Sequence, residues 1–386
     1  MIDDLRSTIY DCASLPEHSR RGEKKAKKDH SIMAQWRKYK IHRENGELAD
    51  AQFPVIVSAS RSTDIPAFYA DWFFHRLKVG YSAWTNPFNG VKNYVSYANT
   101  RFIVFWSKNP KPLLQHLDYL QERNINCYIQ YTLNDYVAEG LERGVPDVAE
   151  RIETFKALVD KLGKGRVVWR FDPLILTDKI SIDNLLRKIE NIGNQLLGYN
   201  EKLVFRFADI AEYKKVKTNL ERNKVNYSEW TNEQMLDFAQ QLVALNKANG
   251  WNYTLATCGE AADLDGIEHN RCIDDNLMIR FAYNDVDLMK FLGVEIHHIE
   301  NSLFGTQIPA DAIMLPDNLY AIKKKNNADK GQRQFCGCIV SKDIGEYNTC
   351  THLCEYCYAN ASKEVAVRNW KQAKDTNCKS ETITGK

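Results

Sequence analysis

The stretch PVIVSASRSTDIPAFYADWFFHRLKVGYSAWT, residues 54–85, contains one full unit of the pattern that sets the fold. It begins with residues 54–60, a run rich in valine and isoleucine that is typical of a buried strand. Asp64 and Pro66 then favour the start of a helix. The apolar face of that helix consists of Phe68, Trp72, Phe73 and Leu77. A second strand is predicted at residues 81–85, and the order strand, helix, strand indicates a parallel sheet with crossover helices.

The same alternation continues along the chain. Further strands are predicted at 102–107, 127–133, 167–171, 203–207 and 253–257, with helices at 113–121, 146–162, 181–196 and 231–248 between them. An eighth strand candidate is CIVSK, residues 338–342, and residues 364–374 can form its helix. Eight such units predict an α/β fold, a (βα)8 TIM-type or partial barrel. A doubly wound open sheet is the alternative.

The composition indicates a globular protein with a sizeable core. The chain has 386 residues, of which 44% are hydrophobic and 26% charged. No apolar run approaches the ~20 residues needed to cross a bilayer, and the N-terminus lacks the apolar core of a secretory signal. We therefore expect a cytoplasmic protein without membrane association, in which cysteines stay reduced.

A basic extension is predicted at residues 1–50. Within it, residues 20–43 carry ten lysines and arginines against two acidic residues, Glu23 and Asp29. Such cations can bind the phosphates of DNA or RNA, and Trp36 and Tyr39 can stack on bases. The alternative is a solvated extension that only aids solubility.

A cysteine motif near the C-terminus indicates a metal centre. Residues 350–357 read CTHLCEYC, so Cys350, Cys354 and Cys357 follow a C-x3-C-x2-C spacing. A complete protein-bound [4Fe-4S] cluster usually has four cysteine ligands, and three leave one iron open to a substrate or cofactor. The alternative is zinc, with His352 or another cysteine as the fourth ligand.

Four further cysteines, Cys258, Cys272, Cys336 and Cys338, allow three interpretations. They could bind an auxiliary [4Fe-4S] cluster, bind a structural zinc ion, or remain buried thiols. Because five of the ten cysteines lie between Cys336 and Cys357 in a chain expected in a reducing compartment, metal ligation is favoured over disulfides.

Polar side chains follow the predicted strands at their carboxyl ends, where parallel α/β folds carry their chemistry. The candidates for catalytic residues in the resulting cavity are Lys108, Gln130, Arg170, Asp172 and Arg206. Their charges suit a polar substrate or a carboxylate.

The string TCTHLCEYCYAN, residues 349–360, resembles the radical S-adenosylmethionine superfamily and is close to the version in spore photoproduct lyase and its relatives. The stretches SASRSTDIPAFY, NPFN, RFDPL and QFCGCIVSKDIGEYNTCTHLCEYCYAN are similar to an uncharacterised bacterial family with a C-terminal cysteine cluster of this type. The resemblance implies an enzyme that reductively cleaves S-adenosylmethionine at a [4Fe-4S] cluster to give a 5'-deoxyadenosyl radical. It also implies an electron donor such as flavodoxin or ferredoxin.

In the superfamily the cysteine loop follows the first barrel strand, whereas here it lies near the end of the chain. The resemblance therefore implies a circularly permuted barrel over residues 51–375, with residues 338–342 as strand one and residues 54–60 as strand two. On that mapping Tyr356, Arg61, Thr63 and Asp64 are the candidates for cofactor binding. The cysteine cluster occupies residues 336–357, and residues 376–386 form a tail.

Three functions are open at this point. The basic extension favours a radical enzyme that acts on nucleic acid. The second possibility is a radical enzyme that acts on a small molecule or peptide. The third is a zinc-stabilised nucleic-acid-binding protein without catalysis.

Overall fold

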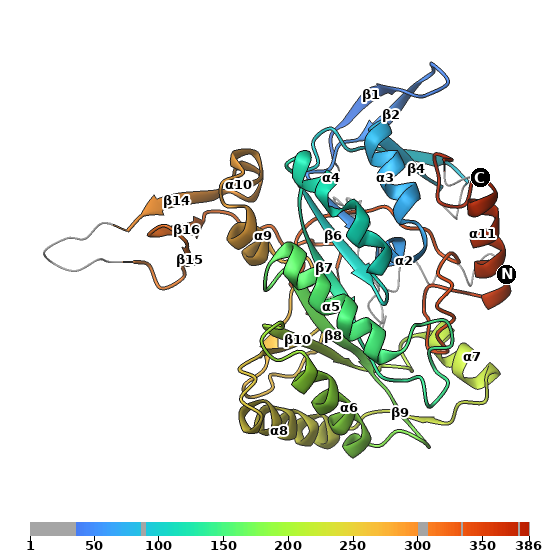
Figure 1. Ribbon diagram of the computed structural model, residues 1–386, viewed down its shortest axis with the longest axis vertical. Coiled ribbons are helices and arrows are strands. Elements are labelled where there is room, and N and C mark those ends of the chain that lie inside the picture. The colour runs from blue at the N-terminus through green and yellow to red at the C-terminus, as the bar shows by residue number, and fades with distance from the viewer. Residues whose placement is uncertain (1–35, 86–89, 300–307, 333–334, 377–378, 386) are drawn as a thin grey trace, which may run out of the picture.

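The computed structural model describes residues 36–85, 90–299, 308–332, 335–376 and 379–385. At its centre lies a sheet of eight strands in the order β13-β12-β10-β8-β7-β6-β3-β17, and all neighbours are parallel (Figure 1). The strands are β3 (Ile56–Ala59), β6 (Phe102–Ser107), β7 (Asn126–Thr132), β8 (Val167–Leu174), β10 (Lys202–Phe207), β12 (Thr254–Thr257), β13 (Glu268–His269) and β17 (Lys342–Asp343). The α/β class predicted from the sequence is confirmed.

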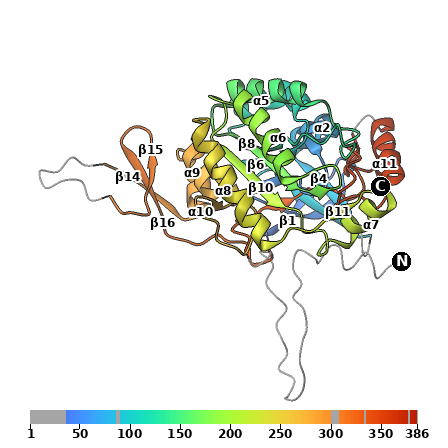
Figure 2. The same ribbon diagram turned by 90° about the horizontal axis from the view of Figure 1, so that it is seen from below.

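Helices connect the strands and cover the outside of the sheet (Figure 2). They are α2 (Ile65–Phe68), α3 (Ala70–Val79), the 3-10 helix η1 (Lys111–His116), α4 (Leu117–Glu122), α5 (Val148–Leu162), α6 (Ile182–Gln195), α7 (Lys214–Arg222), α8 (Asn232–Ala248) and α11 (Lys363–Asp375). The strand side chains Ile103, Ile129 and Trp169 are fully buried and share one core with Phe155 of α5 and Phe238 of α8. Removal of this apolar surface from water is what holds helices and sheet together.

Residues 81–85 form a strand, as predicted, but not in the parallel sheet. They form β4 (Tyr81–Thr85), which pairs antiparallel with β5 (Lys92–Ser96) in a separate sheet of order β1-β2-β5-β4. The chain continues from β4 directly into β5 rather than into a crossover helix, so the two pair as neighbours. In the parallel sheet β3 pairs directly with β6, and the apolar pattern did not indicate the edge strand β13 beside β12.

The two edge strands of the parallel sheet, β13 and β17, are only two residues long. Among the strands that the structure describes, no pairing joins these two edges into a ring. β17 pairs in parallel with β3, with Lys342 opposite Val57 and Asp343 opposite Ser58. A strand from the end of the chain therefore lies beside a strand from its beginning.

The predicted strand at 338–342 overlaps β17 by one residue. Ile339 instead forms an isolated bridge with Ala328, and Cys338 belongs to a group of thiols described below. The pairing with β3 therefore begins at Lys342.

Part of the predicted basic extension belongs to the folded structure, while residues 1–35 lie outside the described residues. β1 (Lys38–His42) and β2 (Leu48–Gln52) form an antiparallel hairpin. Trp36 stacks on Phe291 with ring centroids 5.7 Å apart, whereas Tyr39 is 48% exposed. Arg43 forms an ion pair with Glu381 at 3.0 Å, so the hairpin is tied to the C-terminal segment.

The segment predicted as a C-terminal tail also packs against the fold where it is described. Ile383 is 1% exposed, and Ala83 of β4 donates its backbone N–H to the carbonyl of Glu381 at 2.7 Å. The indole N–H of Trp72 donates to the carbonyl of Ser380 at 2.9 Å. These contacts attach the segment to α3 and β4.

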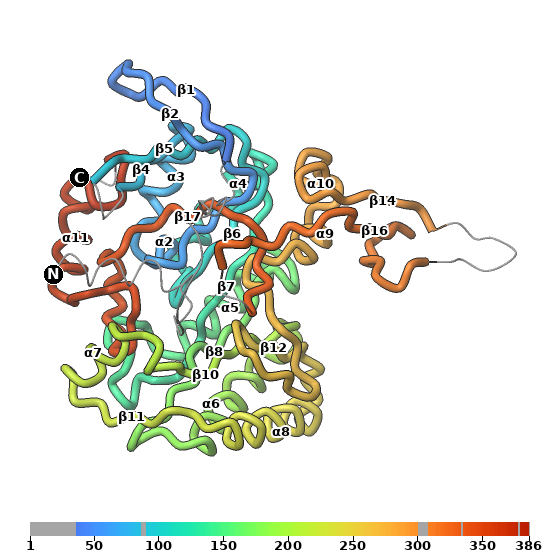
Figure 3. Tube along the Cα trace, turned by 180° about the vertical axis from the view of Figure 1, so that it is seen from behind, coloured from blue at the N-terminus to red at the C-terminus, as the bar shows by residue number. Residues whose placement is uncertain are grey.

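A small sheet projects from the body of the molecule next to α9 (Asp275–Ala282) and α10 (Val286–Leu292) (Figure 3). It consists of β14 (Val294–His298), β16 (Leu319–Lys323) and β15 (Ile313–Leu315). The strands β9 (Leu176–Thr177) and β11 (Tyr227–Ser228) form a separate antiparallel ribbon. Of the helices in the described residues, none has the length and apolar character that a bilayer span requires.

Candidate metal and cofactor site

The cysteine loop, residues 349–360, connects β17 to α11 and packs against segments that follow β3, β6 and β7. The hydroxyl of Tyr69 donates to the carbonyl of Thr349 at 2.7 Å, and Glu142 forms an antiparallel bridge with Cys354. The backbone N–H of Gly144 donates to the carbonyl of His352 at 2.9 Å. A Cβ at Gly144 would lie 2.6 Å from the backbone oxygen of Thr351, so only glycine allows this close approach.

Asp64 holds the cysteine loop to the end of β6. Its Oδ1 accepts from the backbone N–H of Ala67 at 2.9 Å and from the hydroxyl of Ser107 at 2.7 Å. Its Oδ2 lies 2.7 Å from the backbone nitrogen of Lys108 and 2.7 Å from Nε2 of His352. A carboxylate accepts about four hydrogen bonds, so all its positions are used within the protein. The cofactor contact predicted for Asp64 would have to displace one of them.

Both ring nitrogens of His352 are engaged. Nε2 contacts Asp64, and Nδ1 lies 3.1 Å from the carbonyl oxygen of Gly144. A histidine that ligates a metal through one nitrogen can keep a partner on the other, but not on both. His352 would have to give up one of these contacts to act as a fourth zinc ligand.

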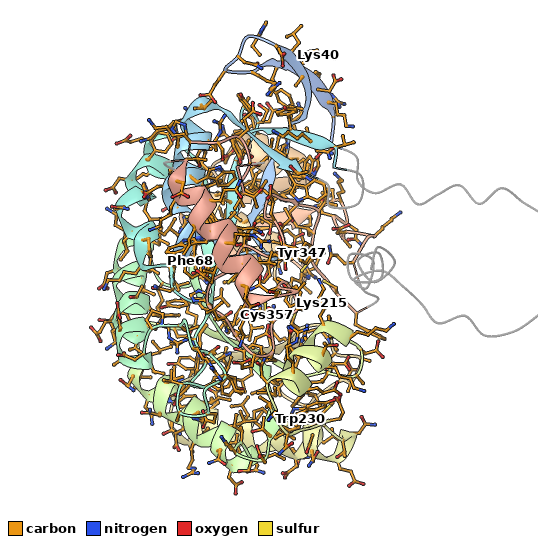
Figure 4. All side chains as sticks on the ribbon, turned by 90° about the vertical axis from the view of Figure 1, so that its right-hand side faces the viewer. Lys40, Phe68, Lys215, Trp230, Tyr347 and Cys357 are labelled. Carbon is orange, nitrogen blue, oxygen red and sulfur yellow. The ribbon has the colours of Figure 1, made fainter. Side chains whose placement is uncertain are left out.

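Cys350, Cys354 and Cys357 carry free thiols. Burial raises the pKa of each. Lys108 opposes this rise at Cys354 and Cys357, and Lys215 does so at Cys357. In Figure 4, Cys357, Lys215 and Tyr347 lie close together below α11, and the Lys215 ammonium is 5.4 Å from the ring centroid of Tyr347. Cations are thus in place to offset thiolate charge in the loop.

Glu142 is a fully buried carboxylate that anchors Tyr356 of the motif. It accepts hydrogen bonds from the Tyr356 hydroxyl and from the Lys108 ammonium, the latter at 2.7 Å. Burial by itself would raise the pKa of Glu142, but Lys108 and Arg151 lower it to about 2. The Lys108 ammonium also lies 3.0 Å from the Tyr356 hydroxyl. Glu142 is therefore a carboxylate at neutral pH, and its negative charge lies beside the cations Lys108 and Arg151.

The other four cysteines come together at a second place. We call Cys258, Cys272, Cys336 and Cys338 the tetrathiol group. The sulfurs of Cys258 and Cys272 are 3.2 Å apart, and Cys338 interacts with both Cys272 and Cys336. Cys258 directly follows β12, Cys272 precedes α9, and Cys336 and Cys338 lie on the segment that leads to β17. Residues from three separate segments thus meet at the carboxyl end of the sheet.

Arginines and an aromatic ring lie beside the tetrathiol group. The guanidinium carbons of Arg61 and Arg170 are 5.5 Å and 5.4 Å from the ring centroid of Trp106, at the end of β6. The guanidinium carbon of Arg206 is 5.1 Å from the ring centroid of Tyr213, and its buried Nε has no hydrogen-bond partner. These cations can hold an anionic group of a ligand.

The five predicted catalytic residues meet around Asp172, whose carboxylate interacts with Arg170, Arg206 and Lys108. Gln130 donates to the backbone carbonyl of Cys272 at 2.9 Å and accepts from Arg170 at 3.2 Å, so both belong with the tetrathiol group. Arg206 also faces this group through Cys258. Lys108 belongs with the cysteine loop. Asp172 lies between the two groups, because its carboxylate pairs with Arg170 and its backbone N–H donates to Asn134.

Of the predicted cofactor contacts, Thr63 has a buried hydroxyl without a hydrogen-bond partner, and Arg61 lies against Trp106. Tyr356 is buried and tied to Glu142 and Lys108. Thr63 and the Arg61 guanidinium therefore keep hydrogen-bonding groups for a ligand.

Sequence reasoning missed two anchoring residues. Glu142 lies in a loop without periodicity, so nothing in the sequence marked it. Asp343 accepts from the hydroxyls of Ser58 and Ser60 and from the backbone N–H of Arg61 at 2.8 to 3.0 Å. Asp343 directly follows the predicted strand 338–342, and that position was an available signal.

Across the residues that the structure describes, no three or more histidine, cysteine, aspartate or glutamate side chains form a ready-made site for a metal ion. A family model with the description "Domain of unknown function (DUF1848)" matches residues 56–359. No curated protein and no solved structure matches the chain.

Proposed function

The chain belongs to the DUF1848 family, and we propose that it is a radical S-adenosylmethionine enzyme with a [4Fe-4S] cluster on Cys350, Cys354 and Cys357. The observation that carries this proposal is the position of the cysteine loop. The loop follows β17, and β17 lies parallel to β3 at the edge of the sheet. A permuted barrel, with β17 as strand one and β3 as strand two, requires this neighbourhood. The proposed fold is accordingly a partial, permuted barrel.

The donor set fits such a cluster better than it fits zinc. The loop offers three free thiols, and a closed structural zinc site needs four ligands. His352, the expected fourth ligand, has both ring nitrogens engaged. Cluster thiolates bind separate irons and need not converge on one point. Three thiols on one loop, with Lys108 and Lys215 to offset their charge, meet that requirement.

When bound, the cluster supplies the electron that cleaves S-adenosylmethionine into methionine and a 5'-deoxyadenosyl radical. The residues of the chain would bind S-adenosylmethionine and orient it. Thr63 has an unpaired buried hydroxyl for a polar group of the cofactor, and Arg206 has an unpaired buried N–H for a carboxylate. Tyr136 packs edge-on against Tyr356 with ring centroids 6.1 Å apart and so supports the aromatic residue of the motif. An electron donor such as flavodoxin or ferredoxin is required.

The test is anaerobic purification with iron and sulfide analysis, followed by dithionite and S-adenosylmethionine. We expect bound iron and sulfide, and release of 5'-deoxyadenosine. Cys354→Ala removes both, whereas Cys127→Ala, which changes another buried free thiol in β7, keeps both. Wild-type protein without iron, or a Cys354→Ala variant with as much iron as the wild type, would refute the proposal.

For the substrate we propose nucleic acid, on the strength of the basic segment. Because residues 36–52 pack on the fold through Trp36 and the β1–β2 hairpin, deletion of residues 1–35 tests the segment without disturbing that packing. We expect the deletion to abolish salt-sensitive binding of DNA or RNA while 5'-deoxyadenosine release persists. Unchanged nucleic-acid binding would leave a small molecule or peptide as the substrate class.

A further inference from the structure

We propose that the tetrathiol group binds one zinc ion as a closed structural site, separate from the cysteine loop. The fold brings its four sulfurs together from three chain segments, although Cys258 and Cys338 are far apart in sequence. The contact between Cys258 and Cys272, at 3.2 Å between sulfurs, is direct. Four cysteines and no other ligand type form one of the usual structural zinc sets.

N–H donors are directed at two sulfurs of the tetrathiol group. Cys272 sulfur accepts from the guanidinium of Arg170 at 3.2 Å and from the side-chain amide of Asn270 at 3.3 Å. Cys338 sulfur accepts from the backbone N–H of Ile273 at 3.4 Å. A neutral thiol is a weak acceptor, whereas a metal-bound thiolate is held in place by such outer donors. Three N–H donors on two sulfurs therefore prepare a metal site.

Charge near the group has the sign that a zinc tetrathiolate needs. Four thiolates and one Zn²⁺ carry a net charge of −2, so cations must stand nearby. Arg61 and Arg170 face the sulfurs, and each also interacts with one carboxylate, Asp343 and Asp172 respectively. Because each of these two arginines has a carboxylate partner, Arg206, which also acts on this group, supplies the remaining positive charge.

The spacing favours a single ion over an auxiliary cubane cluster. Zn–S bonds of ~2.3 Å in a tetrahedron place the sulfurs about 3.8 Å apart, whereas cubane thiolates bind separate irons and lie farther apart. The observed 3.2 Å between Cys258 and Cys272 is shorter than the tetrahedral edge, so the spacing of this one pair is nearer to that of a single ion than to that of a cubane. Among the described residues the sulfurs do not yet surround one point, so binding requires the thiol side chains to rotate and open this contact.

Such a site would fix the segment that leads to the cysteine loop. Cys336 and Cys338 lie just before β17, and Cys258 and Cys272 flank β13. Zinc would clamp the two short edge strands that no described backbone pairing joins. The inference stands whether or not the cysteine loop binds a cluster.

The test measures metal content of the full chain rather than activity. Protein produced with zinc is assayed for zinc, iron and sulfide beside three variants: C272S/C338S, C350S/C354S/C357S and C127S. We expect about one zinc per chain in the wild type, in the triple variant and in C127S, and at least a tenfold loss in C272S/C338S. Because the triple variant keeps its zinc even if the loop never binds iron, failure of the proposed function is distinguishable from failure of this inference.

A second measurement covers the case in which C272S/C338S does not fold. Wild-type chain exchanged with Co²⁺ should show the visible bands of tetrahedral cobalt with sulfur-to-metal charge transfer, and the triple variant should show the same bands. Wild-type protein without zinc whose four thiols all react with iodoacetamide would overturn the inference. So would a Cys258–Cys272 disulfide in purified protein, or iron and sulfide retained by the triple variant.

Discussion

Replacement of Glu142 by glutamine removes the charge of a fully buried carboxylate while it keeps the side-chain volume and an oxygen that can accept from Tyr356. The ammonium nitrogen of its partner Lys108 lies 2.7 Å from the Glu142 carboxylate, and the Lys108 side chain is 16% exposed. The guanidinium of Arg151, which is fully buried, lies 4.0 Å from the same carboxylate. Loss of one partner of a buried ion pair costs about 3–5 kcal/mol, because the remaining charge stays buried without compensation. We therefore expect E142Q to lower the free energy of unfolding by that amount.

The chain offers a matched control at almost the same place. Lys111 and Glu150 form a pair at 2.8 Å, but their side chains are 58% and 44% exposed. For such a surface pair, E150Q should cost about 0–1 kcal/mol. Urea unfolding of both variants is followed by circular dichroism. The two unfolding free energies are compared with one m-value used for both variants. If E142Q costs no more than E150Q, the assignment of Glu142 as the buried counter-ion of Lys108 is wrong.

Two further variants test the attachment of the cysteine loop and of the C-terminal segment. Gly144→Ala places a Cβ 2.6 Å from a backbone oxygen of the loop and should lower both the melting temperature and the bound iron. The control Gly331→Ala meets only a flexible side chain and should change neither. Equal iron in the two variants would contradict the close packing at Gly144. Burial alone would raise the pKa of Glu381, but its bonds with Arg43 and Tyr81 lower it. The Glu381 carboxylate therefore stabilises the fold above the unfolded-state pKa of about 4.3, and this contribution disappears as pH falls through the lower folded value. Thermal melts of E381Q should accordingly lie below wild type at neutral pH and converge with it as pH falls below the folded-state value, and a constant gap would contradict the shift.

The strands and helices of the parallel sheet were largely predictable, because their apolar periodicity is set by the same burial that stabilises them. Residues 102–107 alternate over two buried faces, and residues 231–248 follow a helical period; both gave β6 and α8 with nearly the observed bounds. β13 was not predictable, since its two residues, Glu268 and His269, are exposed and carry no apolar signal. The pairing of β4 with β5 was not predictable, because a local sequence pattern does not show which strand will lie beside it.

The site was predictable to the extent that local spacing determines it. The cysteine loop and Tyr356 follow from one continuous motif. The gathering of Cys258 and Cys272 with Cys336 and Cys338 required the fold, although their chemistry had already suggested a common ligand set. Glu142 was invisible because a buried carboxylate in an irregular loop is recognisable only from the cations around it.

The parallel pairing of β17 with β3 also fixes when the cysteine loop can form during protein synthesis. Ala59 leaves the ribosome 291 residues before Cys350, a delay of about 15 to 60 seconds at ordinary elongation rates. During that interval the strands from β3 to β12 can assemble, so the loop meets a surface that already contains Asp64, Lys108 and Glu142. Such long-range pairing raises the contact order of the domain, and a higher contact order goes with slower folding.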